Sequence, residues 1–134
     1  MKILLDTNIL ISTFALHSTS IKNLLDLCIE KGHKLFIDDY CMNELNDVLT
    51  KKFFDIQKNV STINSIMDLP SVSFVFTDPS KKCSRNVRDA KDERVISSAL
   101  ANQMDVLLTG DKDLLTLKNA KIPILNPASL MNVI

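Results

Sequence analysis

Five short apolar runs alternate along this chain with longer segments whose apolar residues recur at helical spacing. The runs cover residues 2–5, 34–37, 72–76, 106–109 and 122–125. Short, nearly continuous apolar runs are typical of strands buried on both faces of a parallel sheet. Alternation of such strands with helices indicates an α/β fold. We therefore expect three layers, α/β/α, with a central, mainly parallel sheet of about five strands.

The segments between the runs predict the helices. Ile21, Leu24, Leu25 and Cys28 follow an i, i+3, i+4, i+7 pattern, which places them on one helical face. Other helices are expected over residues 8–16, around Glu44, over 55–69, from about Asp92 to Gln103, in a short turn after Gly110, and over 127–133. A length of 134 residues fits one domain, so residues 1–134 are expected to form a single domain.

Composition limits the functional classes. The chain carries 16 basic and 16 acidic residues, whereas a dedicated nucleic-acid-binding module is usually basic. A nuclease is still compatible, because an acidic active site can offset basic residues around it. The three cysteines, Cys28, Cys41 and Cys83, lack zinc-site spacing and predict buried or free thiols in a reducing cytoplasm. No apolar run approaches the ~20 residues that span a bilayer, so we expect a cytoplasmic protein without a membrane segment.

Four acidic residues are predicted to meet at one edge of the sheet. Asp6 ends the first run, and Asp111 lies just beyond the fourth. Glu44 is about one and a half turns into the helix after the second run, and Asp92 begins the helix that leads into the fourth. Sites in open α/β sheets form at the carboxyl ends of the strands, which is where these four segments would converge.

Crowded carboxylates need a compensating charge. Carboxylates a few Å apart repel one another, and a hard divalent cation removes that cost. Mg²⁺ and Mn²⁺ prefer oxygen ligands, and water bound to such an ion is acidic enough to attack a phosphodiester. The sequence therefore predicts one or two Mg²⁺ or Mn²⁺ ions at Asp6, Glu44, Asp92 and Asp111, with no covalent nucleophile.

Four motifs in chain order resemble those of PIN-domain ribonucleases. They are Leu4-Leu5-Asp6-Thr7-Asn8-Ile9-Leu10, Asn43-Glu44-Leu45, Arg88-Asp89-Ala90-Lys91-Asp92-Glu93 followed by Ala99, and Leu108-Thr109-Gly110-Asp111-Lys112-Asp113-Leu114-Leu115. The resemblance covers essentially the whole chain. It implies a metal-dependent endoribonuclease that cuts single-stranded RNA, frequently a dimer. Many members resemble VapC, the toxin of a toxin–antitoxin pair, so it also implies a protein antitoxin.

Several neighbours of the four acids have supporting roles in this interpretation. Asn8 could orient Asp6 or a metal-bound water, or could be a turn residue. Thr109 could hydrogen-bond a carboxylate, or could simply end a strand. Asp89 and Asp92 would share a helical face, and either could be a helix cap. In related toxins the acid precedes a small helical Ala by seven positions, as Asp92 precedes Ala99, which favours Asp92 with Asp89 as a helper.

One basic concentration lies close to Asp92. It comprises Lys81, Lys82, Arg85, Arg88, Lys91 and Arg94. It is either a solvated loop or a set of sequence-independent phosphate contacts to RNA. Arg85, Arg88, Lys91 and, after Asp111, Lys112 are the candidates for RNA binding.

Other functional classes fit less well. A haloacid-dehalogenase phosphatase needs a second Asp two residues after Asp6, where this chain has Asn8. A response-regulator receiver needs paired acids and a Lys after its last strand, which the sequence lacks. An RNA maturation or decay nuclease, or a PIN-like domain that only binds RNA or protein, remains as the alternative.

Overall fold

The computed structural model describes residues 1–75, 90–118 and 120–134. Its five strands are β1 (Lys2–Leu5), β2 (Lys34–Asp38), β3 (Val72–Val75), β4 (Val106–Leu108) and β5 (Ile124–Leu125). They form one sheet in the order β3-β2-β1-β4-β5, and each pair of neighbours is parallel. The predicted parallel sheet of five strands is confirmed.

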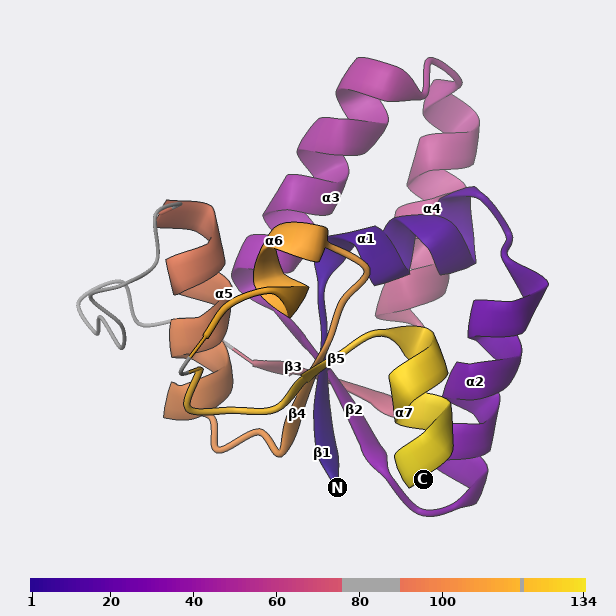
Figure 1. The fold of residues 1–134 in the computed structure, drawn as a ribbon. Helices are drawn as coiled ribbons and strands as arrows, with labels where there is room; N and C mark the ends of the chain where they lie inside the picture. The colour runs from indigo at the N-terminus through magenta and orange to yellow at the C-terminus, as the bar shows by residue number, and fades with distance from the viewer. Residues whose placement is uncertain (76–89, 119) are drawn as a thin grey trace.

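Helices cover both faces of this sheet. They are α1 (Thr7–Leu10), α2 (Thr19–Glu30), α3 (Asp39–Lys52), α4 (Ile56–Met67), α5 (Ala90–Ala101), α6 (Lys112–Leu115) and α7 (Pro127–Val133), with a π-helical turn η1 (Ile11–Ala15). Figure 1 shows α5 on one side of the sheet and α2 with α7 on the other, which confirms the three layers. Among the described residues, no helix is long and apolar enough to cross a membrane.

Several element boundaries differ from the sequence prediction. The helix expected over residues 8–16 is divided, because α1 widens into the π turn η1, where the Thr13 hydroxyl donates to the Ile9 carbonyl at 2.7 Å. Helix α5 begins at Ala90 and ends at Ala101, so Asp92 lies inside the first turn. The end of α5 comes early because Gln103 takes a left-handed φ of 56°. Strand β5 begins only at Ile124, after Pro123.

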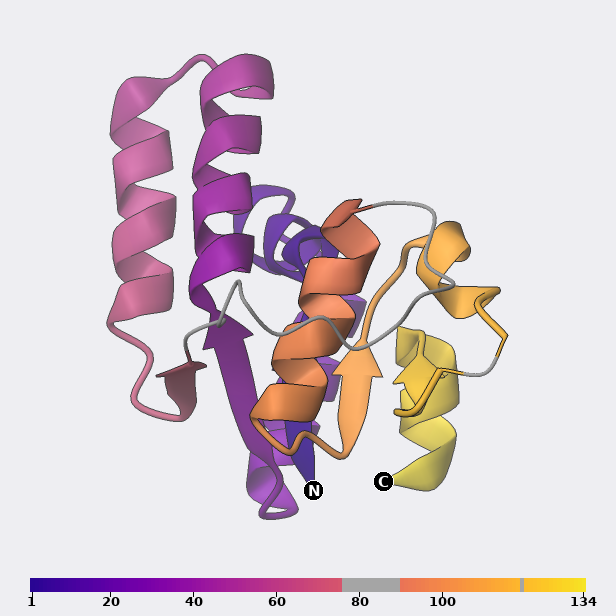
Figure 2. The ribbon, with the colours of Figure 1, turned by 90° about the vertical axis from the view of Figure 1, so that its left-hand side faces the viewer.

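The central strand β1 brings the chain to the edge of interest. Ile3, Leu4 and Leu5 are at most 1% exposed, as expected for a strand covered on both faces. Strands β2 and β4 flank it. Beyond the carboxyl end of β2, α3 and α4 extend as an antiparallel pair past the edge of the sheet, and α5 begins at this same end (Figure 2).

Candidate active site

Asp6 lies at the carboxyl end of β1, the middle strand. Its backbone N–H donates to the Leu108 carbonyl at 3.0 Å, which continues the pairing of β1 with β4. Its Oδ1 accepts from the Thr7 N–H at 2.8 Å and caps α1. The residue is only 6% exposed. Asp6 is therefore a buried carboxylate held at both backbone and side chain, so its direction is set by the fold.

Thr109 connects Asp6 to the loop after β4. Its hydroxyl donates to Asp6 Oδ2 at 2.7 Å and accepts from Asn8 Nδ2 at 3.3 Å and from the Asp111 N–H at 3.0 Å. Asn8 Oδ1 in turn accepts from the Gly110 N–H at 3.0 Å. Asn8 and Thr109, two of the three supporting residues predicted from the sequence, thus tie the β1–α1 junction to the segment that carries Asp111.

The electrostatics of Asp6 place two further acids near it. Burial raises the pKa of the Asp6 carboxyl, hydrogen bonds from Thr109 and Thr7 oppose this, and the negative charges of Glu44 and Asp111 raise it further. Glu44 is half-buried on α3. Asp111 is half-buried and caps α6 by accepting from the Asp113 N–H at 2.9 Å. Three of the four predicted acids are therefore electrostatically coupled at one edge of the sheet.

Asp92 approaches the same end of the fold from α5. It lies in the first turn of that helix and is 6% exposed. The beginning of α5 lies near the first turn of α3, since the guanidinium carbon of Arg94, two residues after Asp92, lies 4.8 Å from the centroid of the Tyr40 ring. Glu44 follows Tyr40 by four residues, one turn along α3. The geometry thus brings the Asp92 segment next to the Glu44 segment.

The oxygen donors suit a hard divalent cation, although they are not yet closed around one point. Within residues 1–75, 90–118 and 120–134, no group of three His, Cys, Asp or Glu side chains is already arranged to hold an ion. Asp6 nevertheless combines burial with the charges of two neighbouring carboxylates. Buried or half-buried carboxylates that repel one another are the ligands that Mg²⁺ and Mn²⁺ select.

The predicted RNA contacts are only partly within the described chain. Arg85, Arg88 and the helper Asp89 lie outside the described residues. Lys91 belongs to the first turn of α5, and Lys112 is an exposed residue that directly follows Asp111. Their roles in binding RNA stay predictions.

Two residues near Asp6 were not assigned to the site from the sequence. Cys41, fully buried on α3, places its Sγ 3.9 Å from Asp6 Oδ1 as a donor. Asp38 ends β2, is fully buried, and caps α3 by accepting from the Cys41 N–H at 2.7 Å. Burial, with the charges of Asp38 and Asp6, raises the pKa of the Cys41 thiol, so it remains a proton donor. The strand-end argument used for Asp6 would also have found Asp38, but the Cys41 contact has no sequence signal.

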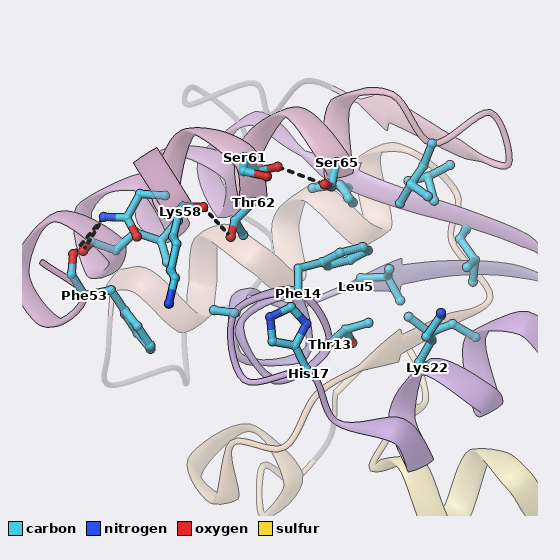
Figure 3. Close-up of a pocket in the computed structure, with 18 of the residues that line it drawn as sticks. Leu5, Thr13, Phe14, His17, Lys22, Phe53, Lys58, Ser61, Thr62 and Ser65 are labelled. Carbon is cyan, nitrogen blue, oxygen red and sulfur yellow. Dashed lines mark hydrogen bonds between the residues drawn. The ribbon is translucent and has the colours of Figure 1, made fainter. Parts of the chain in front are cut away.

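The structure also has a cavity that none of the four predicted acids lines. This cavity of about 1030 Å³ is bounded by η1, α2, α3 and α4, and Leu5, Leu35 and Ile37 of the sheet contribute to its lining. Figure 3 shows Phe14 extending from η1 toward α4, with Lys58 and Phe53 farther along the cavity. Phe54, which also lines it, is 84% exposed. An apolar cavity with an exposed aromatic side chain is typical of a surface that a partner covers.

Comparison with known proteins places the chain in a structural family. A sequence model of the PIN domain matches residues 2–113. No protein of curated function matches the sequence significantly. One similar solved structure is VapBC2 from Rickettsia felis bound to a DNA fragment from the VapBC2 promoter. One of its chains is 18% identical to this chain and superposes with a TM-score of 0.70, and the match covers 94% of this chain and 98% of that chain.

Two further solved structures share the fold. FitAcB from Neisseria gonorrhoeae has 17% identity and a TM-score of 0.63, over 94% of this chain and 98% of that chain. The PIN domain endonuclease Utp24 has 19% identity and a TM-score of 0.59, over 93% of this chain and 84% of that chain. At such identities the likeness concerns the fold.

Proposed function

This chain belongs to the PIN-domain family, and on that premise we propose that it is a metal-dependent endoribonuclease that cuts single-stranded RNA. The observation that carries the proposal is the buried carboxylate of Asp6, on which the charges of Glu44 and Asp111 act at the carboxyl edge of a parallel sheet. A buried carboxylate with like-charged neighbours is costly in an ion-free protein and favourable beside a cation.

The residues of the site have separate tasks in this proposal. Asp6, Glu44, Asp92 and Asp111 would hold one or two Mg²⁺ or Mn²⁺ ions. When bound, such an ion lowers the pKa of a water molecule and offsets negative charge on the phosphodiester. Thr109 keeps Asp6 Oδ2 in place through its 2.7 Å hydrogen bond, and Asn8 holds the backbone before Asp111 through Gly110.

Substrate binding would rest on backbone charge rather than on base identity. Lys112 is exposed beside Asp111, and Lys91, Arg88 and Arg85 precede Asp92 in the sequence. Cations beside an acidic centre attract phosphates and offset the repulsion between RNA and carboxylates. We therefore expect RNA affinity to fall steeply with salt concentration.

The biological role that we propose is that of a toxin with a protein antitoxin. Support comes from the fold shared with VapBC2 and FitAcB, and from the apolar cavity bounded by η1, α2, α3 and α4, which offers a large surface for an apolar partner segment. The alternative is an RNA maturation or decay nuclease, and the shared fold with the endonuclease Utp24 is compatible with it.

The direct test is cleavage of an unstructured RNA by purified protein. We expect cutting with Mg²⁺ or Mn²⁺, none with a chelator, and none after Asp6→Asn. Asp47→Asn is the matched control, because Asp47 is an exposed acid on the helix that carries Glu44. RNA binding without metal-dependent cutting would refute the nuclease and favour a binding domain, and release of phosphate from a small phosphomonoester would favour a phosphatase.

The toxin role has its own test. Induced expression should arrest bacterial growth, and co-expression of the product of the adjacent reading frame should relieve the arrest and yield a stable complex. Light scattering of the purified protein would check the predicted homodimer. A protein that cuts RNA in vitro but neither arrests growth nor binds a neighbouring product would favour RNA maturation or decay.

A further inference from the structure

A cation–aromatic stack joins the two helices that carry Glu44 and Asp92. The guanidinium carbon of Arg94, on α5, lies 4.8 Å from the centroid of the Tyr40 ring, on α3. Both residues are half-buried, so the stack is partly shielded from water. Such pairs are stronger when desolvated. The stack therefore connects the beginning of α5 to the first turn of α3.

Tyr40 and Arg94 are each close in sequence to one of the predicted acids. Tyr40 precedes Glu44 by four residues, so the two lie on the same face of α3. Arg94 follows Asp92 by two residues within the beginning of α5. A shift of α5 against α3 at this point would change the position of Asp92 relative to Glu44 directly.

Two features of its surroundings make the Arg94 side chain energetically costly. Its Nε is buried and has no hydrogen-bond partner in the described part of the chain. A positive charge near the amino end of a helix is also opposed by the helix dipole. A long cationic side chain at this position is thus costly by two criteria, and its stack on the Tyr40 ring offsets part of that cost.

We propose that Tyr40 and Arg94 are positioning residues that set the location of Asp92 for metal binding. This inference rests on the proposed function of the site, and neither residue is assigned a contact with the ion or the RNA. Loss of the ring should free the first turn of α5 and weaken metal binding by about tenfold, at the lower end of the effect of removing groups that orient metal ligands.

The first experiment needs no metal. Hydrogen exchange of the metal-free protein would be followed at the backbone amides of residues 94–97, which hydrogen-bond to the first-turn carbonyls of α5. Tyr40→Leu should accelerate this exchange about three- to thirtyfold, which corresponds to the strength of such a stack. Tyr40→Phe keeps the ring, and with it the stack, and should exchange more slowly at these amides than Tyr40→Leu.

The second experiment measures Mn²⁺ affinity by calorimetry. Tyr40→Leu should weaken it about tenfold, while Tyr40→Phe should not. Phe36→Leu is the matched control, since Phe36 also stacks with a cation, Lys2 at 5.2 Å, but lies on β2 rather than on α3 or α5. In an Asp92→Asn background, Tyr40→Leu should have no further effect, because its action passes through Asp92.

Each outcome has one consequence. If Tyr40→Leu weakens Mn²⁺ affinity equally in the wild-type and the Asp92→Asn background, the positioning role is overturned. It is also overturned if Tyr40→Leu leaves hydrogen exchange at the amides of residues 94–97 unchanged. Wild-type protein that binds no Mn²⁺ overturns the proposed function and this role together. Wild-type protein that binds Mn²⁺ and cuts RNA, with an unchanged Tyr40→Leu variant, overturns the positioning role alone.

Discussion

Replacement of Thr109 by Val tests whether its hydroxyl organises the acidic site. Val has nearly the shape of Thr, so the packing of this fully buried side chain is retained. The change removes the donor to Asp6 Oδ2 and the acceptor for Asn8 Nδ2 and the Asp111 N–H. Only hydrogen bonding changes, which makes the comparison clean.

The expected loss in the free energy of unfolding depends on the groups that no longer have the Thr109 hydroxyl as a hydrogen-bond partner. A hydrogen bond to a charged group contributes about 1.5–3 kcal/mol, and Asp6 remains buried without it. The Asn8 amide and the Asp111 backbone N–H are only partly buried, so water can replace the lost hydroxyl and these two groups add little. We expect a loss of about 2.5 kcal/mol. With an unfolding entropy of about 2.1 cal/mol/K per residue over 134 residues, this lowers Tm by about 9 °C.

Thr109→Ser is the matched control, because it keeps the hydroxyl and removes a methyl group. Its expected cost is about 1 kcal/mol, or about 4 °C. Apolar packing alone would predict the opposite order, with Val tolerated better than Ser. Thermal unfolding followed by circular dichroism distinguishes the two. If the Val variant is as stable as the Ser variant and binds Mn²⁺ equally well, the organising role of Thr109 is refuted.

Three other predictions concern catalysis, pH and the partner surface. Glu44→Gln should lower the rate of RNA cleavage about 100-fold or more, since a metal ligand contributes several kcal/mol. Asp47→Asn should leave the rate unchanged. Equal activity of the two variants in a single-turnover assay would show that Glu44 is not part of the site. Burial raises the pKa of the Asp6 carboxyl above its ordinary value of 3.8. The folded, metal-free protein therefore binds the carboxyl proton more tightly than the unfolded chain does. As a result, the free energy of unfolding falls as the pH rises from 3.8 through the raised pKa. Added Mg²⁺ should therefore raise Tm more at about pH 7.5 than at about pH 5, and an equal gain measured by calorimetry would contradict this. Phe54→Ser should change Tm by less than about 2 °C because Phe54 is 84% exposed, yet weaken capture of a co-expressed antitoxin; unchanged capture would place the partner elsewhere.

The fold class and the approximate elements could be predicted from the sequence, because burial leaves a local record. A strand covered on both faces is apolar over nearly its whole length, and this pattern predicted β1 over Lys2–Leu5, as observed. A helix packed on one side shows its period, as Leu24, Leu25 and Cys28 do on α2. The same logic predicted that Asp6 would end a buried strand at the edge where sites form.

Local patterns could not predict contacts between distant segments. Thr109 and Asp6 are 103 positions apart, and the sequence left Thr109 as either a hydrogen-bonding group or a strand end. The sequence predicted Cys41 only as a buried or free thiol, and the packing of α3 against β2 and α1 brings this thiol to Asp6. The division of the first helix by η1 and the start of α5 at Ala90 were also missed, because cooperative packing outweighs weak local preferences at helix ends.

The spacing of apolar residues indicates which side of each segment faces the interior, and this can be inferred for each segment separately. It contains no information on how far Arg94 lies from Tyr40, or on which acids act on Asp6. Those distances result from the parallel register of β1 with β2 and β4 and from the packing of α3 and α5, which many residues decide together. The local chain thus specified the layers and the acids at strand ends, and the tertiary structure decided which side chains hold those acids in place.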